Sequence, residues 1–469
     1  MLSAMAFSFG GDSACSASNT GIGSSDVMKA RRADLETLAA FIGARGVSSE
    51  LSALSFMEIG PLAARRMRPS RLFDSTALSL AASLAERSWV GLQGLPACLL
   101  EPEVDVGGLC QSLATANLPS FVAGWPAQLA RQGFPKCTIT RKAEAMPKTT
   151  TSYGVQSMNY HVSSVLDGSP ISVRQWLPPP EIDSRAVVQL THGISEHSGR
   201  YDHFARHLAE NGYRVYASDL RGHGLSVPQT QLGQASIHFW ADTTADMKQL
   251  LDIMHAENPN LPRFAFGHSL GSALTQGHIQ AWGAMLKGAI LCGTFGAFPG
   301  MSGSQLRDAA EAVRPLAFSA DTSDKVSTLF LDLLNNLNKV SGPNFKGCDW
   351  QTSDQIEIDR FLRDPLNGKP FCNRMMYGVL LGLSQLWTPE NERLIPQDLP
   401  ILIMCGTRDP VGGMTTTVQA LIDRYRKNGV REVSHIFYDG VRHEPMNDFS
   451  RDQFHADVVA WLNQHLPRN

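Results

Sequence analysis

The sequence RFAFGHSLG, residues 263–271, decides the fold of this chain. Residues 263–266 are mostly apolar and predict a buried strand, and a helical pattern begins at Leu270. The GxSxG motif stands between them. Where this motif joins a strand to a helix, the turn is so sharp that it raises the serine hydroxyl above the sheet. We therefore expect Ser269 to be a nucleophile, with glycine at Gly267 and Gly271 because a Cβ there would meet neighbouring backbone.

Strands and helices alternate on both sides of this turn. Strands are expected at 159–165, 171–176, 186–190, 213–218, 263–266, 289–292, 401–404 and 433–438. Helices are expected at 201–210, 243–257, 270–285, 418–427 and 454–466. Asp167-Gly168 between the first two strands indicates a hairpin. The later alternation, with short connections, predicts an α/β fold with a mostly parallel sheet and helices on both faces. A site would lie at the carboxyl ends of its strands.

One long segment interrupts the alternation. Residues 293–400 separate two expected strands and contain apolar residues at helical spacing in 326–340 and again in 377–386. An insertion of this size is most simply a helical cap over the sheet, at about 297–395.

A serine nucleophile needs a base, and the base needs a carboxylate that orients it. Asp409 lies just past the strand at 401–404, and His443 lies in the loop before the last helix. These places and this chain order suit the acid and the base of a Ser-Asp-His triad. Asp439 is an alternative acid, or else a turn residue or ion-pair partner of Arg442. His435 falls inside a strand and is expected to pack in the core.

Two backbone N–H groups are candidates for an oxyanion hole. That of Leu270 opens a helix behind the serine, and that of Ile194 lies in the loop after the third strand, where Gly193 allows close approach. We expect His192 and His268 to support the site by packing or hydrogen bonding. His192 and His197 have no third ligand at a metal spacing, so no metal and no cofactor are expected. The loop DLRGHGLS, 219–226, is expected to be structural.

Composition limits the remaining possibilities. The chain has 469 residues, too many for one ordinary domain, and its net charge of -3 gives no attraction to nucleic acid. Eight cysteines are scattered without metal spacing, which favours free thiols in a reducing compartment. No apolar stretch approaches the roughly 20 residues that span a bilayer, and the N-terminus lacks the features of a secretory signal. We therefore expect a cytoplasmic protein.

The first part of the chain differs from the rest. All 14 histidines lie at or after His161, and the run Pro147–Ser152 resembles a linker. We expect residues 1–157 to form an extension of unknown role that is weakly helical or disordered, and residues 158–469 to form the enzyme-like domain. An upstream stretch translated from a wrongly chosen start and a helical partner-binding domain are the open alternatives for the extension.

The segments HGISEHSGRY, DLRGHGLS, GHSLG, GTRDPV and RHEPMND, in this order, resemble the monoacylglycerol lipase and lysophospholipase group of α/β-hydrolases. DWQTSDQIEIDRFLRDPL in the insertion is similar to that group as well. The resemblance covers about residues 158–469. It implies an eight-stranded core, a cap between strands six and seven, and an acyl-enzyme mechanism. The roles given above for Ser269, Asp409, His443, Ile194 and Leu270 are also those that it implies.

Two departures from the group stand out. Ser272 occupies a position where the group usually has glycine, and 367–371 differs from the usual cap segment, which leaves substrate preference open. The expected function is ester hydrolysis of monoacylglycerols or lysophospholipids, small acyl ester substrates, with transient contact between the cap and lipid surfaces as a hypothesis. A general carboxylesterase or thioesterase is the close alternative, and a non-catalytic binding protein on the same fold is the distant one.

Overall fold

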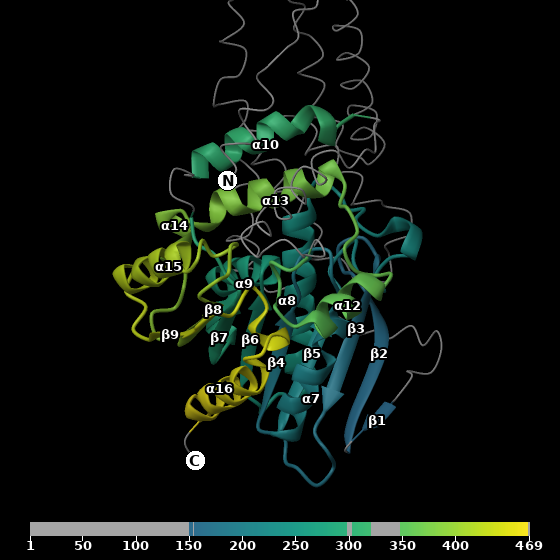
Figure 1. The fold of residues 1–469 in the computed structure, drawn as a ribbon, viewed down its shortest axis with the longest axis vertical. Helices are drawn as coiled ribbons and strands as arrows, with labels where there is room; N and C mark the ends of the chain where they lie inside the picture. The colour runs from purple at the N-terminus through teal and green to yellow at the C-terminus, as the bar shows by residue number, and fades with distance from the viewer. Residues whose placement is uncertain (1–149, 153, 298–302, 320–347, 468–469) are drawn as a thin grey trace, which may run out of the picture. The chain divides into compact units, whose positions relative to one another are not determined.

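A mostly parallel β-sheet forms the centre of the structure (Figure 1). The structure is a computed structural model, and it describes residues 150–152, 154–297, 303–319 and 348–467. Its strands run in the order β1-β2-β3-β5-β4-β6-β7-β8-β9. The strands are β1 (Thr150–Ser152), β2 (Val155–Ser163), β3 (Pro170–Leu177), β4 (Ala186–Thr191), β5 (Tyr213–Ser218), β6 (Arg263–His268), β7 (Gly288–Cys292), β8 (Ile401–Gly406) and β9 (Val433–Tyr438). The pairs β1-β2, β2-β3 and β3-β5 are antiparallel. All other neighbours in this order, from β5-β4 to β8-β9, are parallel. The predicted α/β class is confirmed.

The sheet has one strand more than the eight that the sequence predicts. β1 pairs antiparallel with β2, with Thr150 opposite Ser157. Its residues belong to the run expected to be a linker, but β2 offers an unpaired edge with which this run pairs. The sheet therefore begins before the expected boundary at 157. The expectation for the rest of the extension concerns residues 1–149 and 153, which lie outside the described residues.

The predicted hairpin joins β2 and β3. Gly168 has φ +72°, a left-handed conformation that glycine adopts without a steric penalty. The carboxylate of Asp167 accepts a hydrogen bond from the N–H of Ser169 at 3.0 Å. The hairpin places Tyr160 opposite Val173 in the antiparallel register.

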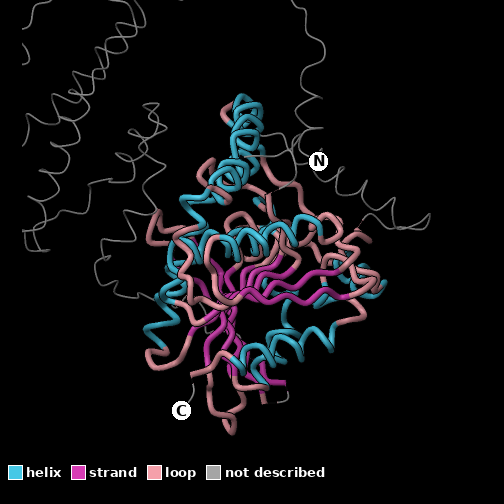
Figure 2. Tube along the Cα trace, turned by 90° about the vertical axis from the view of Figure 1, so that its left-hand side faces the viewer, coloured by secondary structure: helices cyan, strands magenta, loops and turns pink. Residues whose placement is uncertain are grey.

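Helices cover both faces of the sheet, and Figure 2 shows the strands between them. They are α7 (Asp202–Glu210), α8 (Phe239–Glu257), α9 (Leu270–Trp282), α15 (Thr416–Lys427) and α16 (Arg451–Gln464). Alternate residues of β6 show the two faces: Phe264 and Phe266 pack with α7 and α16, whereas Ala265 packs with α8, α9 and α15. A strand segment buried on both faces is apolar, which explains the run Phe264-Ala265-Phe266. No described helix is long and apolar enough to cross a membrane.

The insertion between β7 and β8 carries helices α10 (Gly303–Ala317), α12 (Gln355–Arg363), α13 (Asn373–Leu386) and α14 (Pro389–Glu392). α13 confirms the predicted helix at 377–386, and it lies beside α10 (Figure 1). The expected helix at 326–340 lies outside the described residues. α13 is tied to the sheet's own helices, because Gln280 of α9 donates to the carbonyl of Leu386 at 2.8 Å.

Helix α9 carries a histidine without a hydrogen-bond partner among the described residues. His278 is fully buried, neither ring nitrogen is bonded, and its ring centroid lies 5.2 Å from that of Trp282. Burial lowers the pKa of His278 to about 3. The side chain therefore stays neutral in the folded protein under mildly acidic conditions, whereas an unfolded histidine, with a pKa of about 6.5, takes up a proton.

This difference predicts an acid-dependent cost of folding. Because only the unfolded chain binds the proton between pH 6.5 and 3, His278 lowers the stability of the fold as the pH falls through that window. We expect His278→Leu to remove this cost. The unfolding free energy of the variant minus that of wild type should therefore rise by about 2 kcal/mol when the pH is lowered from 7 to 5. Urea unfolding at both pH values measures it. His435→Gln, at an exposed position of β9, is the control, and an unchanged pH dependence in His278→Leu would contradict the account.

Candidate active site

The turn between β6 and α9 holds Ser269 in a strained backbone conformation. Its φ of 54° and ψ of −120° lie where non-glycine residues are rare. The N–H of Ser269 donates to the carbonyl of Cys292 in β7 at 3.1 Å. The carbonyl of Ser269 accepts from the N–H groups of Ser272 and Ala273 at 2.9 and 3.1 Å. The sharp strand-to-helix turn that the sequence predicts is therefore present.

The two glycines of the motif leave room for this turn. A Cβ at Gly267 would lie 2.3 Å from the hydroxyl of Thr275 and 2.4 Å from the carbonyl oxygen of Gly271. A Cβ at Gly271 would lie 2.2 Å from the carbonyl oxygen of Thr191. Neither position has room for a side chain, as expected from the sequence.

Asp409 and His443 meet at the carboxyl ends of β8 and β9. Nδ1 of His443 lies 3.0 Å from each carboxylate oxygen of Asp409, and both side chains are buried. Asp409 also accepts from the N–H of Val411 at 2.8 Å. Because the carboxylate fixes the proton on Nδ1, Nε2 is left as the basic nitrogen. Nε2 is buried and has no partner among the described residues.

The competing candidates from the sequence lie elsewhere. Asp439 is exposed and accepts from the hydroxyl of Thr407 at 3.2 Å, as a turn residue would. Arg442 donates instead to the carbonyl of Asp349 at 2.6 Å. The expectation that His435 packs in the core is wrong: β9 is the last strand of the sheet, and His435 is exposed there beside Phe437.

The loop after β4 lies against the turn at Ser269. A Cβ at Gly193 would come within 3.2 Å of Cβ of Ser269 and 2.6 Å of Glu196 Oε1. The N–H of Gly193 donates to that same Glu196 oxygen at 2.6 Å. In contrast, the N–H groups of Ile194 and Leu270, the two expected oxyanion donors, have no acceptor among the described residues.

His192 fixes the orientation of this loop. Its Nε2 lies 2.9 Å from the N–H of Leu220 and accepts from it, so Nδ1 carries the proton and donates to the carbonyl of Gly193 at 2.7 Å. Burial lowers the pKa of His192, which keeps this neutral form. The supporting role expected for His192 is therefore a hydrogen bond to the peptide whose N–H belongs to Ile194.

A cluster of buried charges links the loop after β4 to the loop that carries His443. Arg200 donates to both carboxylate oxygens of Glu444 at 2.8 Å and also pairs with Glu196 at 2.5 Å. Tyr201 donates to Glu196 at 2.7 Å, and Nδ1 of His268 lies 3.3 Å from the same carboxylate. We call these five residues the charge cluster. His268 thus has the hydrogen bonds to a nearby loop that the sequence led us to expect.

The two carboxylates and the guanidinium of the charge cluster stay ionised despite their burial. Burial alone would raise the pKa of Glu196, but Arg200 and His268 lower it well below its ordinary value. Burial likewise opposes the charge of Arg200, but Glu444 and Glu196 raise its pKa. Glu196, Arg200 and Glu444 were not among the site residues predicted from the sequence. Their only signal was that each lies within a motif segment, HGISEHSGRY or RHEPMND.

Ser272 is accommodated behind the turn. Its hydroxyl donates to the carbonyl of Ser269 at 2.7 Å and lies 2.8 Å from the hydroxyl of Thr294. Gln276 donates to the same threonine hydroxyl at 3.0 Å. The departure at Ser272 therefore adds a hydrogen bond to the helix start and leaves Asp409 and His443 untouched.

No three His, Cys, Asp or Glu side chains converge as metal ligands in the ranges that the structure describes. His197, one of the two histidines considered in the sequence, faces a carboxylate of the insertion: its Nε2 lies 2.9 Å from Asp364 Oδ2. The other, His192, has both nitrogens engaged with backbone.

Comparisons with known proteins agree with the fold. Residues 182–450 match the family model Hydrolase_4, described as serine aminopeptidase, S33. The chain is 33% identical to human monoglyceride lipase, over 68% of this chain and 95% of that protein. It is 27% identical to a monoacylglycerol lipase of Mycolicibacterium smegmatis, over 61% of this chain and 91% of the relative. A thermostable carboxyl esterase from Bacillus coagulans, solved with glycerol, superposes with a TM-score of 0.59 at 27% identity, over 66% of this chain and 98% of the esterase.

The charge cluster predicts a large loss of stability when its cation is removed. Arg200→Met would leave the carboxylates of Glu196 and Glu444 buried without compensation, and we expect the unfolding free energy to fall by about 3–5 kcal/mol. Arg360→Met is the matched control, because the Arg360 guanidinium is exposed and its partner Glu357 also pairs with Arg451. Removal of Arg360 should therefore cost less than about 1 kcal/mol. Equal losses in urea unfolding of the two variants would contradict this account of the charge cluster.

Proposed function

Because this chain belongs to the Hydrolase_4 family of α/β-hydrolases and is a serine ester hydrolase, we propose that it cleaves monoacylglycerols or lysophospholipids with a Ser269-Asp409-His443 triad. One observation carries the proposal. His443 places Nδ1 3.0 Å from both oxygens of Asp409 and leaves Nε2 without a partner among the described residues. A histidine oriented in this way can act as a general base, because its unprotonated Nε2 can accept the proton of the nucleophile.

The reaction begins at the serine hydroxyl. Nε2 of His443 takes the proton of Ser269 as Oγ attacks the ester carbonyl, and the carbon becomes tetrahedral. The imidazolium, held by Asp409, then gives its proton to the leaving alcohol, and the acyl group stays on Ser269. Water repeats the two steps, with His443 again as base and then acid, and the carboxylic acid leaves. No redox partner enters this cycle.

The negative charge that forms on the carbonyl oxygen is held by backbone N–H groups. We assign this role to Ile194 and Leu270, whose N–H groups have no acceptor among the described residues. Removing one donor from such a site costs on the order of 10²–10³ in rate. The start of α9 adds the favourable end of the helix dipole at Leu270.

A large apolar cluster that includes Leu270, the residue after the serine, favours an acyl chain over a sugar or a peptide. Leu270 belongs to a buried apolar cluster that also contains Phe295 and, in α13, Met376 and Leu380, and Ile194 packs against it. Both sequence relatives described above are named as lipases of monoacylglycerols. In this proposal, the insertion acts as the cap over the acyl chain.

Contact of the insertion with lipid surfaces belongs to the same proposal. Among the described residues of the insertion, Ile356 and Leu362 of α12 expose large apolar side chains, as does Phe318 directly after α10. Exposed apolar groups of this kind can enter a lipid surface on which a monoacylglycerol resides.

A substrate series tests the proposal. We expect wild type to hydrolyse long-chain monoacylglycerols with higher kcat/KM than p-nitrophenyl acetate, because a longer acyl chain buries more apolar surface. Ser269→Ala should lose at least about 10⁴-fold in kcat, as expected when a triad member is removed. Ser434→Ala, on strand β9, is the control and should retain full activity.

Other results would each favour a named alternative. Activity confined to short aryl esters or thioesters would make the protein a general carboxylesterase or thioesterase. Hydrolysis of aminoacyl p-nitroanilides alone would favour the aminopeptidase activity named in the family description. A folded wild-type protein that is inert to the whole series would be a binding protein on a hydrolase fold.

A further inference from the structure

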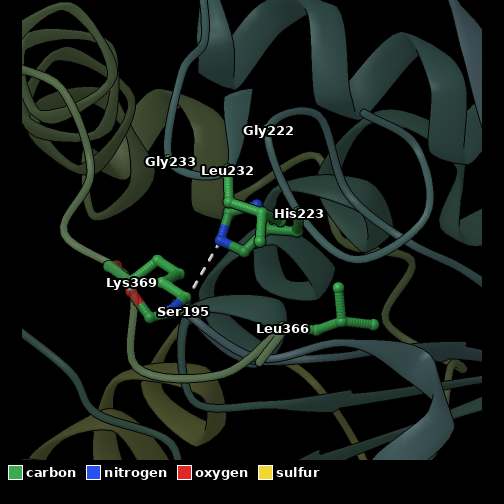
Figure 3. Close-up of a pocket in the computed structure, with 7 residues that line it drawn as sticks. All are labelled: Ser195, Gly222, His223, Leu232, Gly233, Leu366 and Lys369. Carbon is green, nitrogen blue, oxygen red and sulfur yellow. Dashed lines mark hydrogen bonds between the residues drawn. The ribbon is translucent and has the colours of Figure 1, made fainter. Parts of the chain in front are cut away.

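A turn of the insertion lies directly on the loop that carries Ile194. This turn, residues 364–369, follows helix α12, and we call it the docking turn. The N–H of Gly368 donates to the carbonyl of Ser195 at 2.8 Å, and the hydroxyl of Ser195 donates to the carbonyl of Lys369 at 2.8 Å. Asp364, at the start of the docking turn, pairs with His197. Figure 3 shows Ser195 between Lys369 and His223, beside a small hollow.

Ser195 has a backbone conformation that needs such support. Its φ of 56° is left-handed, and it is one of only four non-glycine residues with positive φ in the described ranges. A conformation of this kind persists where several contacts determine it together. All three polar groups of Ser195 are engaged, because its N–H also donates to Nε2 of His223 at 3.1 Å.

His223 is a dependable acceptor for that N–H. Its Nδ1 lies 2.8 Å from the carbonyl of Arg221 and donates to it, so Nε2 is unprotonated. Burial lowers the pKa of His223 to about 3. The bond from Ser195 to His223 therefore persists throughout the neutral and mildly acidic range.

The contacts on either side of Ile194 determine where its N–H points. His192 holds the carbonyl of Gly193, which belongs to the same planar peptide as the N–H of Ile194. The N–H of Gly193 is bound by Glu196 and that of Ser195 by His223, so the loop leaves the N–H of Ile194 available between them. Rotation at Ser195 would change the path of the loop immediately after Ile194.

We propose that the docking turn is a positioning element for the oxyanion hole. By holding Ser195 in its left-handed conformation, the docking turn keeps the N–H of Ile194 aimed at the reacting carbonyl, so that the placement of the insertion and the stabilisation of the transition state are coupled. The inference rests on the proposed function, in which Ile194 is an oxyanion donor. Neither Ser195 nor Asp364 contacts the reacting atoms, so both are positioning residues.

The test removes the docking contacts one at a time. Ser195→Ala removes the hydroxyl that donates to Lys369, and Asp364→Ala removes the pairing with His197 from the side of the insertion. Lys369→Ala is the matched control, because only the backbone carbonyl of Lys369 takes part. With p-nitrophenyl butyrate, we expect kcat to fall about tenfold in Ser195→Ala, less than for complete loss of an oxyanion donor, and severalfold in Asp364→Ala. KM should stay within twofold in both, and Lys369→Ala should match wild type.

A transition-state analogue separates positioning from general damage to the fold. A trifluoromethyl ketone forms a tetrahedral oxyanion on the serine, so its inhibition constant should rise by the same factor as kcat/KM falls. Thermal unfolding shows that each variant is folded at the assay temperature. Retention of kcat and of inhibitor affinity within twofold in both variants would overturn the inference, as would a weakening of the inhibitor smaller than the loss of kcat/KM. Failure of the proposed function is a different result, in which wild type itself is inert towards the ester and the ketone.

Discussion

The backbone at Ser269 is the constraint on which the rest of the site depends. A non-glycine residue at φ 54° and ψ −120° costs on the order of 1–3 kcal/mol, and the surrounding sheet and helix maintain it. β7 accepts the N–H of Ser269 through Cys292, and α9 donates two N–H groups to its carbonyl. Glycine is required at Gly267 and Gly271 because the strand and the helix meet there without room for a Cβ. The sheet and α9 together therefore fix the backbone of the serine.

Those loops are not independent of one another. Glu196, in the loop of Ile194, and Glu444, next to His443, share the guanidinium of Arg200 in a buried site. A shift of either loop would separate charges that burial makes costly to leave unpaired. The insertion contacts both loops. The docking turn accepts a hydrogen bond from Ser195, and the ring centroids of Trp350 and His443 lie 5.1 Å apart. The loop of Ile194, the loop of His443 and the insertion are therefore linked by direct contacts.

The sequence predicted the parts of this arrangement that depend on local order. The turn at Ser269, Asp409 after β8 and His443 after β9 follow from strand ends and chain order, which a single sequence displays. Contacts between distant segments left no such pattern. Arg200 and Glu444 are 244 positions apart, and Ser195 and Lys369 are 174 apart, so neither pairing could be predicted from periodicity. The exposure of His435 and the presence of β1 were not predicted, because both depend on which strands lie at the two edges of the sheet.

Covalent labelling tests the central claim, that Ser269 is the nucleophile of this fold, most directly. The full-length protein would be treated with a fluorophosphonate probe, and the adduct located by peptide mass spectrometry. The account predicts one phosphonylated residue, Ser269, with no labelling of Ser269→Ala and much slower labelling of His443→Gln, because the hydroxyl would lack its base. A folded protein that forms no adduct, or one labelled at another serine that reacts equally in Ser269→Ala, would contradict it.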